Sequence, residues 1–550
     1  MSVATERSPL PVREARVPLV PVKVSTPLPM GGDTFQTSRV NAAIRALLGD
    51  SREITQVNWL RAVARLVVDM RPDIGSTLVT HLGVTALDGE SPVGHMSIGE
   101  IGVVYEALMA LSDRERRKSQ GQFFTPDDVA SFMADQARRF PLGAWLDPCC
   151  GVGNLAWHLA NAMDDPGEFV ATRLTLVDLD EVALKTAQVL LVASFADPDD
   201  RSALLRLVSR SEHRSFLDPA PLPSHDFVIV NPPYAAAARD GRFRSAAARD
   251  LYAYFLERVA DESQGFVAIT PASYLSAPKY AQLRQVLSER PGGDVLVFDN
   301  VPDTCFRGFK YGSTNSSKTN FVRAAITVSA PADREWKVTP ILRWAARSRR
   351  NLWLTAREFL VPRRTGPSGE WAKVMPGTEG VWDALATASE TLGTLVTSTP
   401  TPFRLEIAST PRYYVSASKR PLQRTSKHTL YFPSEHTMDK AYILLNSSLP
   451  YWWWRCLDGG ITLPIRTLLT LPVPSAMEVN AELVRLLERS EEDHVVTKLN
   501  AGKHNENIKR PRELVDEIDS AILPGVTYSF DQVYASDMFA GRRLGVIEGG

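Results

Sequence analysis

The chain has 550 residues, of which 44% are hydrophobic, and its formal net charge at pH 7 is −1. This length is enough for several domains that each bury a core, and the balanced charge gives no overall indication of a nucleic-acid partner. The four cysteines form no C-x-x-C pair and no metal-binding spacing, which argues against a disulfide framework or a zinc site and fits the reducing cytoplasm. We therefore expect no metal. We expect no signal peptide, because the N-terminus lacks a basic region followed by an apolar one, and no membrane-spanning segment, because no apolar run approaches about 20 residues.

The order of patterns along the chain predicts several parts. Residues 1–36, rich in Pro, Val, Thr and Ser, are expected to form a flexible arm, and residues 37–118 a small helical domain. Between residues 119 and 330, short apolar runs alternate with helical stretches, which predicts βαβ units and an α/β fold with a doubly wound, mostly parallel sheet. Residues 331–480 have a mixed α+β pattern, and residues 481–550 predict a charged helical segment and a tail.

One region carries a local excess of positive charge. Residues 303–430 contain 20 Lys and Arg residues against nine Asp and Glu residues. Binding to nucleic acid requires such an excess, although any single charge is also compatible with an ordinary solvated surface. The basic and aromatic residues singled out in this region are Arg349, Arg350, Tyr413, Tyr414, Lys419 and Arg420.

A glycine turn follows the apolar run that ends at Asp147, in the stretch L-D-P-C-C-G-V-G-N-L. Gly151 and Gly153 permit a tight turn and the close approach of a ligand. The next apolar run ends in L-V-D-L-D, so Asp178, and less favourably Asp180, lies where an acid would bind ribose hydroxyls. Both acids are also compatible with helix caps. Neither G-x-G-x-x-G nor G-x-x-x-x-G-K-[ST] occurs, which favours a nucleoside cofactor without a pyrophosphate.

The run D-F-V-I-V ends in N-P-P-Y at residues 231–234. A proline has no backbone donor, so Pro232 and Pro233 stop the strand and Pro232 biases Asn231 toward an extended conformation. Asn231 and Tyr234 are therefore expected at the carboxyl end of a strand, where open α/β sheets place their ligands.

Two further motifs are G-Q-F-F-T-P-D-D-V-A-S-F-M at residues 121–133 and G-F-V-A-I-T-P-A-S-Y-L at residues 265–275. Taken in chain order with the motifs above, they resemble the gamma class of S-adenosylmethionine-dependent DNA adenine-N6 methyltransferases of restriction-modification type. The resemblance covers residues 95–330 and includes I-G-E-I-G-V-V-Y-E-A-L-M, which looks like the family's lead-in. Further downstream, Y-I-L-L-N-S-S-L-P-Y-W-W-W is similar to segments in the DNA-recognition part of single-chain members, although its W-W-W run is more typical of a core. The motifs that carry the resemblance are G-Q-F-F-T-P-D-D-V-A-S-F-M, D-P-C-C-G-V-G-N-L, L-V-D-L-D, N-P-P-Y and G-F-V-A-I-T-P-A-S-Y-L.

The resemblance implies a Rossmann-like methyltransferase fold, S-adenosylmethionine as cofactor and residues 331–480 as the target-recognition domain. It implies that Asn231 lies beside the cofactor and that Asp178 holds the ribose. Near the cofactor adenine, where the family often has an acidic residue, this chain has S-F-L-D, so Ser215 and Asp218 are alternatives. The implied cofactor residues are Phe124, Thr125 and Pro126 at the methionine end, and Asp147, Gly151 and Gly153 as the cradle.

The N-P-P-Y motif suits an amino group whose lone pair is delocalised into a ring. If the Asn231 side-chain oxygen and the Pro232 carbonyl accept its two hydrogens, the lone pair is directed at the methyl group and no strong base is needed. The adenine must be flipped out of the duplex, at a cost of a few kcal/mol, and stacking on Tyr234 would return about 1–3 kcal/mol. The resemblance implies a second aromatic wall, for which Phe306 is the first choice and Phe309 and Phe321 are competitors.

Other functions remain open at this point. Protein-glutamine methyltransferases also use N-P-P-Y, but they are typically smaller and lack F-T-P. The P-D at 302–303 and the E-W-K at 335–337 resemble a nuclease pattern, but such short patterns arise by chance. An inactive scaffold would not need an intact N-P-P-Y and glycine turn.

We therefore expect a cytoplasmic enzyme that methylates N6 of adenine in double-stranded DNA, as a monomer. Its biological role would be restriction-modification or epigenetic marking. A cognate restriction endonuclease, or a separate specificity subunit on which methylation depends, is left open by the sequence, as is the recognition sequence.

Overall fold

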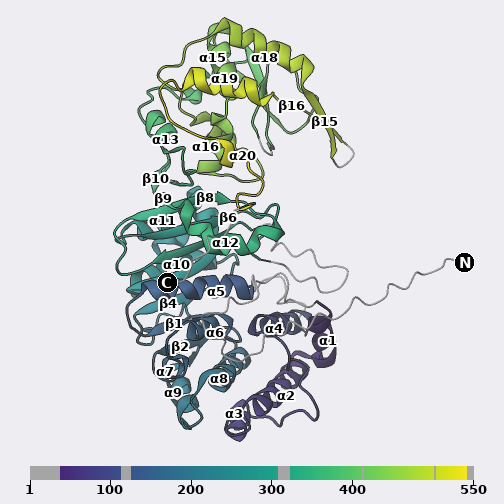
Figure 1. Cartoon of the computed structure of the whole chain (residues 1–550), viewed down its shortest axis with the longest axis vertical. Helices are drawn as coiled ribbons and strands as arrows, with labels where there is room; N and C mark the ends of the chain where they lie inside the picture. The colour runs from purple at the N-terminus through teal and green to yellow at the C-terminus, as the bar shows by residue number, and fades with distance from the viewer. Residues whose placement is uncertain (1–36, 113–124, 307–321, 412–413, 501–502, 542–550) are drawn as a thin grey trace, which may run out of the picture. The chain divides into compact units, whose positions relative to one another are not determined.

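The computed structural model describes residues 37–112, 125–306, 322–411, 414–500 and 503–541, so the predicted arm at residues 1–36 lies outside the described residues. Figure 1 labels the helices and strands of the chain, which divides into two compact units. The first comprises residues 1–237, 250–268 and 306–320, and the second comprises residues 238–249, 269–305 and 321–550. The domain boundaries expected at residues 118, 330 and 480 stay predictions.

The first unit begins with helices, and no strand is described between residues 37 and 112. The N-terminus of α2 is set by Ser51, whose side-chain oxygen accepts a hydrogen bond from the Ile54 amide at 3.3 Å. Trp59 of α2 is fully buried, and its indole donates to the Thr186 hydroxyl at 3.0 Å. These helices are α1 (Thr37–Leu47), α2 (Arg52–Met70), α3 (Gly75–Leu82) and α4 (Ile98–Ser112).

The sheet strands of the first unit lie in the order β3-β2-β1-β4-β5, and β5 belongs to this unit as far as Ala268. The pairs β3–β2, β2–β1, β1–β4 and β4–β5 are parallel, which the alternation of apolar runs and helices predicts. The strands are β1 (Trp145–Asp147), β2 (Leu174–Asp178), β3 (Glu212–His213), β4 (Phe227–Val230) and β5 (Gly265–Pro271). The predicted α/β fold with a mostly parallel, Rossmann-like sheet is confirmed.

Helices connect these strands. Asp180 caps α8, and Asp165 followed by a proline begins α7. The helices are α5 (Asp127–Asp135), α6 (Asn154–Asn161), α7 (Pro166–Thr172), α8 (Glu181–Phe195), α9 (Ala203–Arg210) and α10 (Leu251–Glu262).

In the second unit, sheet strands lie in the order β7-β6-β8-β9. β7 is antiparallel to β6, whereas β8 is parallel to β6. Asp299, directly after β6, is buried and accepts hydrogen bonds from Arg323 at 2.7 Å and from Arg455 at 2.8 Å. The elements are β6 (Gly293–Phe298), β7 (Ala324–Ser329), β8 (Trp336–Leu342), β9 (Val361–Pro362), α11 (Ala281–Ser288) and α12 (Arg349–Thr355).

The rest of the second unit mixes short helices with small antiparallel sheets. The W-W-W run lies in α16, where Trp452, Trp453 and Trp454 are buried, so its assignment to a core is confirmed. The strands are β10 (Arg364–Thr365), β11 (Trp371–Ala372), β12 (Arg404–Ala408), β13 (Ala417–Ser418), β14 (Lys427–Tyr431), β15 (Val495–Asn500) and β16 (Lys503–Ile508). The helices are α13 (Glu379–Leu385), α14 (Leu392–Leu395), α15 (Glu435–Leu445), α16 (Leu449–Leu457), α17 (Ile465–Leu469), α18 (Ala481–Asp493), α19 (Arg512–Ile522) and α20 (Asp531–Tyr534).

The segment after residue 480 differs from its helical prediction in one place. Between α18 and α19, β15 and β16 form an antiparallel hairpin. The stretch V-V-T-K-L has β-branched residues that favour a strand, and the charged sequences around it obscure this signal.

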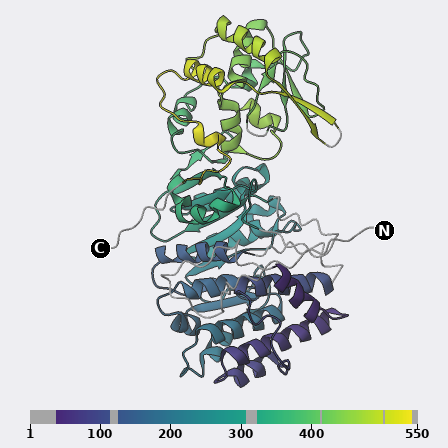
Figure 2. The same ribbon diagram turned by 45° about the vertical axis from the view of Figure 1, so that its right-hand side comes forward.

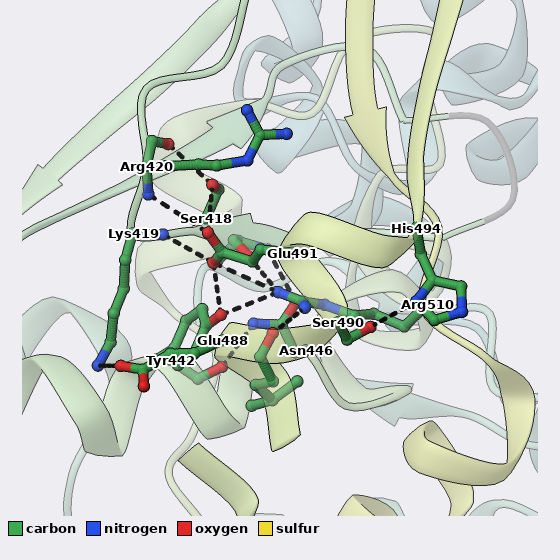
Figure 3. Close-up of polar contacts among 12 residues, drawn as sticks. Ser418, Lys419, Arg420, Tyr442, Asn446, Glu488, Ser490, Glu491, His494 and Arg510 are labelled. Atoms are coloured by element: carbon green, nitrogen blue, oxygen red, sulfur yellow. Dashed lines mark hydrogen bonds and ion pairs between the residues drawn. The ribbon is translucent and has the colours of Figure 1, made fainter. Parts of the chain in front are cut away.

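A buried ion pair organises the C-terminal part of the second unit (Figure 3). The carboxylate of Glu491 in α18 lies 3.5 Å from an Arg510 guanidinium nitrogen, and both side chains are at most 5% exposed. Glu491 also accepts hydrogen bonds from the Ser418 hydroxyl at 3.0 Å, from the Lys419 amide at 2.9 Å and from the Tyr442 hydroxyl. One carboxylate thus connects α18, β13, α15 and the segment after β16.

The Arg510 guanidinium is also satisfied by neutral acceptors. It donates to the Asn446 side chain at 3.1 Å, to the Ala417 carbonyl at 3.0 Å and to the Leu487 carbonyl. Removing Glu491 would therefore leave a buried cation without its counter-charge.

We expect Glu491→Ala to lower the free energy of unfolding by roughly 3–5 kcal/mol, because breaking a buried ion pair leaves its partner uncompensated. Denaturant unfolding followed by circular dichroism measures this loss. The neighbouring exposed residue provides a matched control, since Glu492→Ala should change stability by no more than about 0.5 kcal/mol. Equal effects of the two substitutions would contradict the assigned role.

Candidate active site

Three neighbouring strands of the first unit end around one cavity of about 650 Å³. Asp147, Asp178 and Asn231, at or directly after the ends of β1, β2 and β4, line it. The sheet is parallel here, so the carboxyl ends of these strands lie at the same edge. The cavity is in the size range of pockets that hold cofactors.

The glycine turn forms one wall of this cavity. Gly151 and Gly153 have φ angles of +53° and +94°, a region that favours glycine. A Cβ atom at Gly151 would meet no heavy atom within 4 Å, whereas one at Gly153 would lie 3.0 Å from the Ala187 Cβ of α8. Gly151 thus leaves space beside the cavity, and Gly153 lets the start of α6 approach α8.

Asp178 is bonded to the glycine turn. Its carboxylate accepts hydrogen bonds from the Gly151 amide at 2.7 Å and from the Asp180 amide at 2.8 Å. Burial raises the pKa of Asp178 to about 6, although these backbone hydrogen bonds oppose the shift. A carboxylate has about four lone-pair sites, so Asp178 can still accept hydrogen bonds from ligand hydroxyl groups.

Asp180, the other acid of L-V-D-L-D, has a structural role. Its carboxylate accepts hydrogen bonds from the amides of Val182 and Ala183 at 3.0 and 3.3 Å, and Arg52 donates to it at 3.3 Å. Asp180 is therefore the N-cap of α8, a role with which the sequence is also compatible.

Asp147 holds an unpartnered polar atom at the cavity. Its side chain is 1% exposed, one oxygen accepts a long hydrogen bond of 3.4 Å from the Cys149 amide, and the other has no hydrogen-bond partner in the described part of the chain. Burial raises the pKa of Asp147 to about 8, and the nearby Asp178 adds to the rise. A ligand that donates hydrogen bonds or carries positive charge would satisfy this carboxyl group.

The N-P-P-Y segment is bonded to the F-T-P segment and to the glycine turn. The Asn231 side-chain amide donates to the Thr125 hydroxyl at 2.8 Å, and the Cys149 thiol donates to the Asn231 carbonyl at 3.2 Å. Thr125 also accepts a hydrogen bond at its carbonyl from Asn154 at 2.7 Å. Three motifs that are distant in sequence therefore meet at Thr125.

The remaining residues of these two motifs are placed as follows. Pro232 and Pro233 line the cavity with Asn231, whereas Tyr234 is not among the lining residues. Pro126 lies directly before α5, and the predicted cofactor residue Phe124 lies outside the described residues.

The two predicted base-stacking rings are in contact. Tyr234 and Phe306 pack edge to face with ring centroids 5.9 Å apart and an interplanar angle of 75°, and Tyr252 contacts Tyr234 from another side at 6.2 Å. Phe306 is 1% exposed. This pair is a T-shaped contact rather than two parallel walls, and the competitors Phe309 and Phe321 lie outside the described residues.

Of the two residues that the sequence offers for the cofactor adenine, one lines the cavity. Ser215 lines the cavity together with the buried Phe216. Asp218 is exposed, is not among the lining residues, and accepts a hydrogen bond from the Ala220 amide at 3.0 Å.

Glu106 is a cavity residue that the sequence analysis did not single out. It lies in α4, whose Tyr105 and Met109 line the same cavity, and no hydrogen bond or ion pair of its carboxylate is found among the described residues. Burial raises its pKa to about 7. The sequence signal for Glu106 is the dipeptide Y-E within I-G-E-I-G-V-V-Y-E-A-L-M, a segment interpreted in the sequence only as the part that precedes the F-T-P motif.

Several of the basic residues singled out earlier have internal partners. Arg349 is buried and donates to the carbonyls of Thr304 and Cys305 at 2.6 and 3.0 Å. Lys419 pairs with Asp439 and Glu488 at 2.6 and 2.7 Å, and Arg420 pairs with Glu506 at 2.8 Å. Of the others, Arg350 is exposed, Tyr414 is half-buried and Tyr413 lies outside the described residues.

The nuclease-like residues also have other partners. Asp303 accepts a hydrogen bond from the Trp344 indole at 3.1 Å, and Glu335 pairs with Lys337 at 3.1 Å. Within the described ranges, no group of three or more His, Cys, Asp and Glu residues could hold a metal ion. No helix in the described part of the chain is both long and apolar enough to span a membrane.

Comparisons with known proteins give one family match. Residues 97–256 match the sequence model of the family described as N-6 DNA Methylase, which confirms the resemblance seen in the sequence. A search of curated proteins returned no match.

Three solved structures contain chains that are similar to this one. The type I restriction-modification methyltransferase subunit from Streptococcus thermophilus is 14% identical, with 70% of this chain and 68% of that chain covered and a TM-score of 0.33. The type IIG restriction endonuclease BpuSI is 10% identical, with coverages of 91% and 78% and a TM-score of 0.40. The DrdV–DNA complex is 13% identical, with a TM-score of 0.39, and the match covers 61% of this chain and 42% of that chain.

We expect the Glu106→Gln substitution to flatten the pH dependence of stability. The ordinary pKa of this carboxyl group is 4.5, and burial raises it to about 7 in the folded chain. Between these pH values the carboxyl group is ionised in the unfolded chain but protonated in the folded chain, so the free energy of unfolding falls as the pH rises. The substitution removes the titration, so the variant should gain up to roughly 3 kcal/mol relative to the unsubstituted chain between pH 4.5 and pH 8.

Urea unfolding at these two pH values measures the difference. The exposed carboxylate of Glu90 provides the control, since Glu90→Gln should leave the pH dependence as in the unsubstituted chain. A stability difference between Glu106→Gln and the unsubstituted chain that is the same at both pH values would contradict the assignment.

Proposed function

We propose, from the premise that residues 97–256 form an N-6 DNA methylase domain, that this chain transfers a methyl group from S-adenosylmethionine to N6 of adenine in double-stranded DNA. The observation that carries the proposal is that the glycine turn and the residues Asn231, Pro232 and Pro233 line one cavity, with the unpartnered Asp147 oxygen beside them. Such an enzyme would act in the cytoplasm, as a monomer on DNA, in restriction-modification or epigenetic marking. A cognate endonuclease would be its partner in the first of these roles.

The residues around the cavity suit this cofactor. When bound, S-adenosylmethionine supplies an electrophilic methyl group on a positively charged sulfur. Asp147, Gly151 and Gly153 would form its main cradle, and Asp178 would accept hydrogen bonds from the ribose hydroxyls. Phe124, Thr125 and Pro126 would border its methionine end, and Ser215 rather than Asp218 is proposed to lie beside its adenine, because only Ser215 lines the cavity.

Asn231 is proposed to orient the methyl-accepting amino group. Its side-chain nitrogen donates to Thr125, which assigns the acceptor role to its side-chain oxygen. That oxygen and the Pro232 carbonyl would accept the two hydrogens of the adenine amino group, so that the lone pair points away from both. This arrangement makes the nitrogen nucleophilic without a strong general base.

Tyr234 is proposed to stack on the flipped adenine. Extrusion of a base costs a few kcal/mol, and stacking on an aromatic ring returns about 1–3 kcal/mol. Tyr234 is half-buried between Tyr252 and Phe306, so the rings around it would have to rearrange for Phe306 to become a second, parallel wall.

We expect Asn231→Ala to reduce the rate of methyl transfer about a hundredfold, because one well-placed polar group stabilises such a transition state by roughly 3 kcal/mol. Asn231→Asp, which keeps an acceptor oxygen, should lose less activity. Transfer of labelled methyl to mixed-sequence duplex DNA, followed by nucleoside analysis, measures both rates. Label in protein glutamine instead of N6-methyladenine would replace the proposal with protein methylation, whereas label only on addition of a specificity subunit would identify a dependent methylation subunit.

We expect Asp147→Asn to weaken S-adenosylmethionine binding at least roughly tenfold, because a hydrogen bond to a charged group contributes about 1.5–3 kcal/mol. The pKa of about 8 keeps the ligand-free Asp147 largely protonated at pH 7, so a cationic ligand should release a proton on binding. Affinity should therefore rise between pH 7 and pH 8 in the unsubstituted chain and stay nearly constant over this range in the variant, because Asp178, with its pKa of about 6, is already largely ionised there.

Titration calorimetry in two buffers of different ionisation enthalpy measures the affinity and the proton release together. The exposed Asp218 provides a control of the same chemical type, and Asp218→Asn should leave both quantities unchanged. An unchanged proton release in Asp147→Asn would mean that another group is the one that titrates.

A further inference from the structure

We propose that the hairpin of β15 and β16 is an element that enters the major groove of duplex DNA. This inference rests on the proposed function, because it concerns how the same chain holds its DNA. The hairpin lies in residues 481–550, which the sequence analysis assigned to a helical segment and tail rather than to the target-recognition domain. Its strands leave the end of α18 as a narrow two-stranded ribbon (Figure 2).

The register of the ribbon separates its side chains onto two faces. Val496 lies opposite Asn507, and Lys498 lies opposite Asn505. Because side chains alternate along a strand, these residues share one face, which also includes Lys509, whose amide continues the ladder to the His494 carbonyl at 3.0 Å. We call this the polar face; its described side chains are Val496, Lys498, Asn505, Asn507 and Lys509.

The opposite face anchors the ribbon to its own domain. Ile508 is 1% exposed, and the buried Glu506 accepts hydrogen bonds from the Arg420 guanidinium at 2.8 Å and from the Gln423 amide at 2.7 Å. Arg510, two residues after β16, belongs to the buried cluster of Glu491. The base of the ribbon is therefore fixed, so little ordering would be needed on binding.

The polar face is positively charged. Lys498 and Lys509 are exposed, and no ion pair of either is found among the described residues. Arg424 lies beside this face, donating to the Asn507 side chain at 2.5 Å and to the Glu506 carbonyl at 3.2 Å, and its described contacts include no carboxylate. The described side chains of the polar face include no Asp or Glu, so its charge is complementary to phosphates.

The shape and the chemistry of the ribbon both match a DNA groove. A strand of six residues such as β15 spans about 20 Å, and the major groove, about 12 Å wide, admits a two-stranded ribbon. Asparagine and lysine are among the residue types that contact base edges there, and lysine and arginine also contact phosphates. A basic, amide-bearing ribbon on a rigid base therefore fits duplex DNA better than an acidic or apolar protein partner.

The test compares two substitutions that change the net charge equally on opposite faces. Lys498→Gln removes one positive charge from the polar face, and Thr497→Glu adds one negative charge at the exposed neighbouring residue on the other face. The dissociation constant of the full chain for a fluorescein-labelled mixed-sequence duplex is measured between 50 and 200 mM salt. Denaturant midpoints of both variants confirm that the domain is folded.

We expect Lys498→Gln to weaken binding roughly three- to tenfold and to reduce the slope of log K against log salt by about 1. Thr497→Glu should change the affinity less than twofold and leave the slope unaltered. The double variant Lys498→Gln/Lys509→Gln should multiply the loss and reduce the slope by about 2.

Methylation of the same duplex by the unsubstituted chain separates the possible failures. If it places label on adenine but both single-residue variants bind DNA alike, the ribbon is not in the groove and the proposed function stands. If it neither binds nor labels the duplex, the proposed function fails and the ribbon inference falls with it. If the double variant keeps its DNA affinity but loses a stable complex that the unsubstituted chain forms with another protein, the ribbon is a protein-binding element and the inference is overturned.

Discussion

The hydrogen bond from the Gly151 amide to the Asp178 carboxylate fixes the cavity, because it joins the turn after β1 to the end of β2. The turn can make this bond only because Gly151 adopts a positive φ angle. On the other side, Thr125 accepts hydrogen bonds from Asn231 and Asn154, so the end of β4 and the start of α6 are held as well. The polar atoms around the cavity are therefore placed by the fold before any ligand arrives.

The sequence was sufficient for the features that depend on strand order. Apolar runs alternating with helical stretches predict parallel strands, and parallel strands bring Asp147, Asp178 and Asn231 to one edge. The sequence favoured Asp178 over Asp180, but only the hydrogen bonds of the Asp180 carboxylate to Val182 and Ala183 show that this acid caps a helix. Glu106 was missed because its place at the cavity depends on how α4 packs, which a local pattern does not contain.

The basic excess between residues 303 and 430 shows that composition alone does not predict which charges lie on a binding surface. Many of these cations are internal: Arg323 contacts Asp299, Arg349 binds backbone carbonyls, and Lys419 pairs with two carboxylates. Asp299 pairs with both Arg323 and Arg343 in the second unit, so part of the charge that the sequence suggests for a surface instead holds elements together. The Lys and Arg side chains that remain for a binding partner are identified only by how exposed each one is and by whether it is paired within the chain.

The contact between the Cys149 thiol and the Asn231 carbonyl has a consequence for chemical reactivity. Burial raises the pKa of both Cys149 and Cys150 well above the usual range, so neither thiol forms an appreciable thiolate at neutral pH. Alkylating reagents, which attack the thiolate, should therefore react slowly with both cysteines. Both cysteines line the cavity, so a bound ligand that covers them should slow their labelling further, and the labelling rate would report occupancy of the cavity.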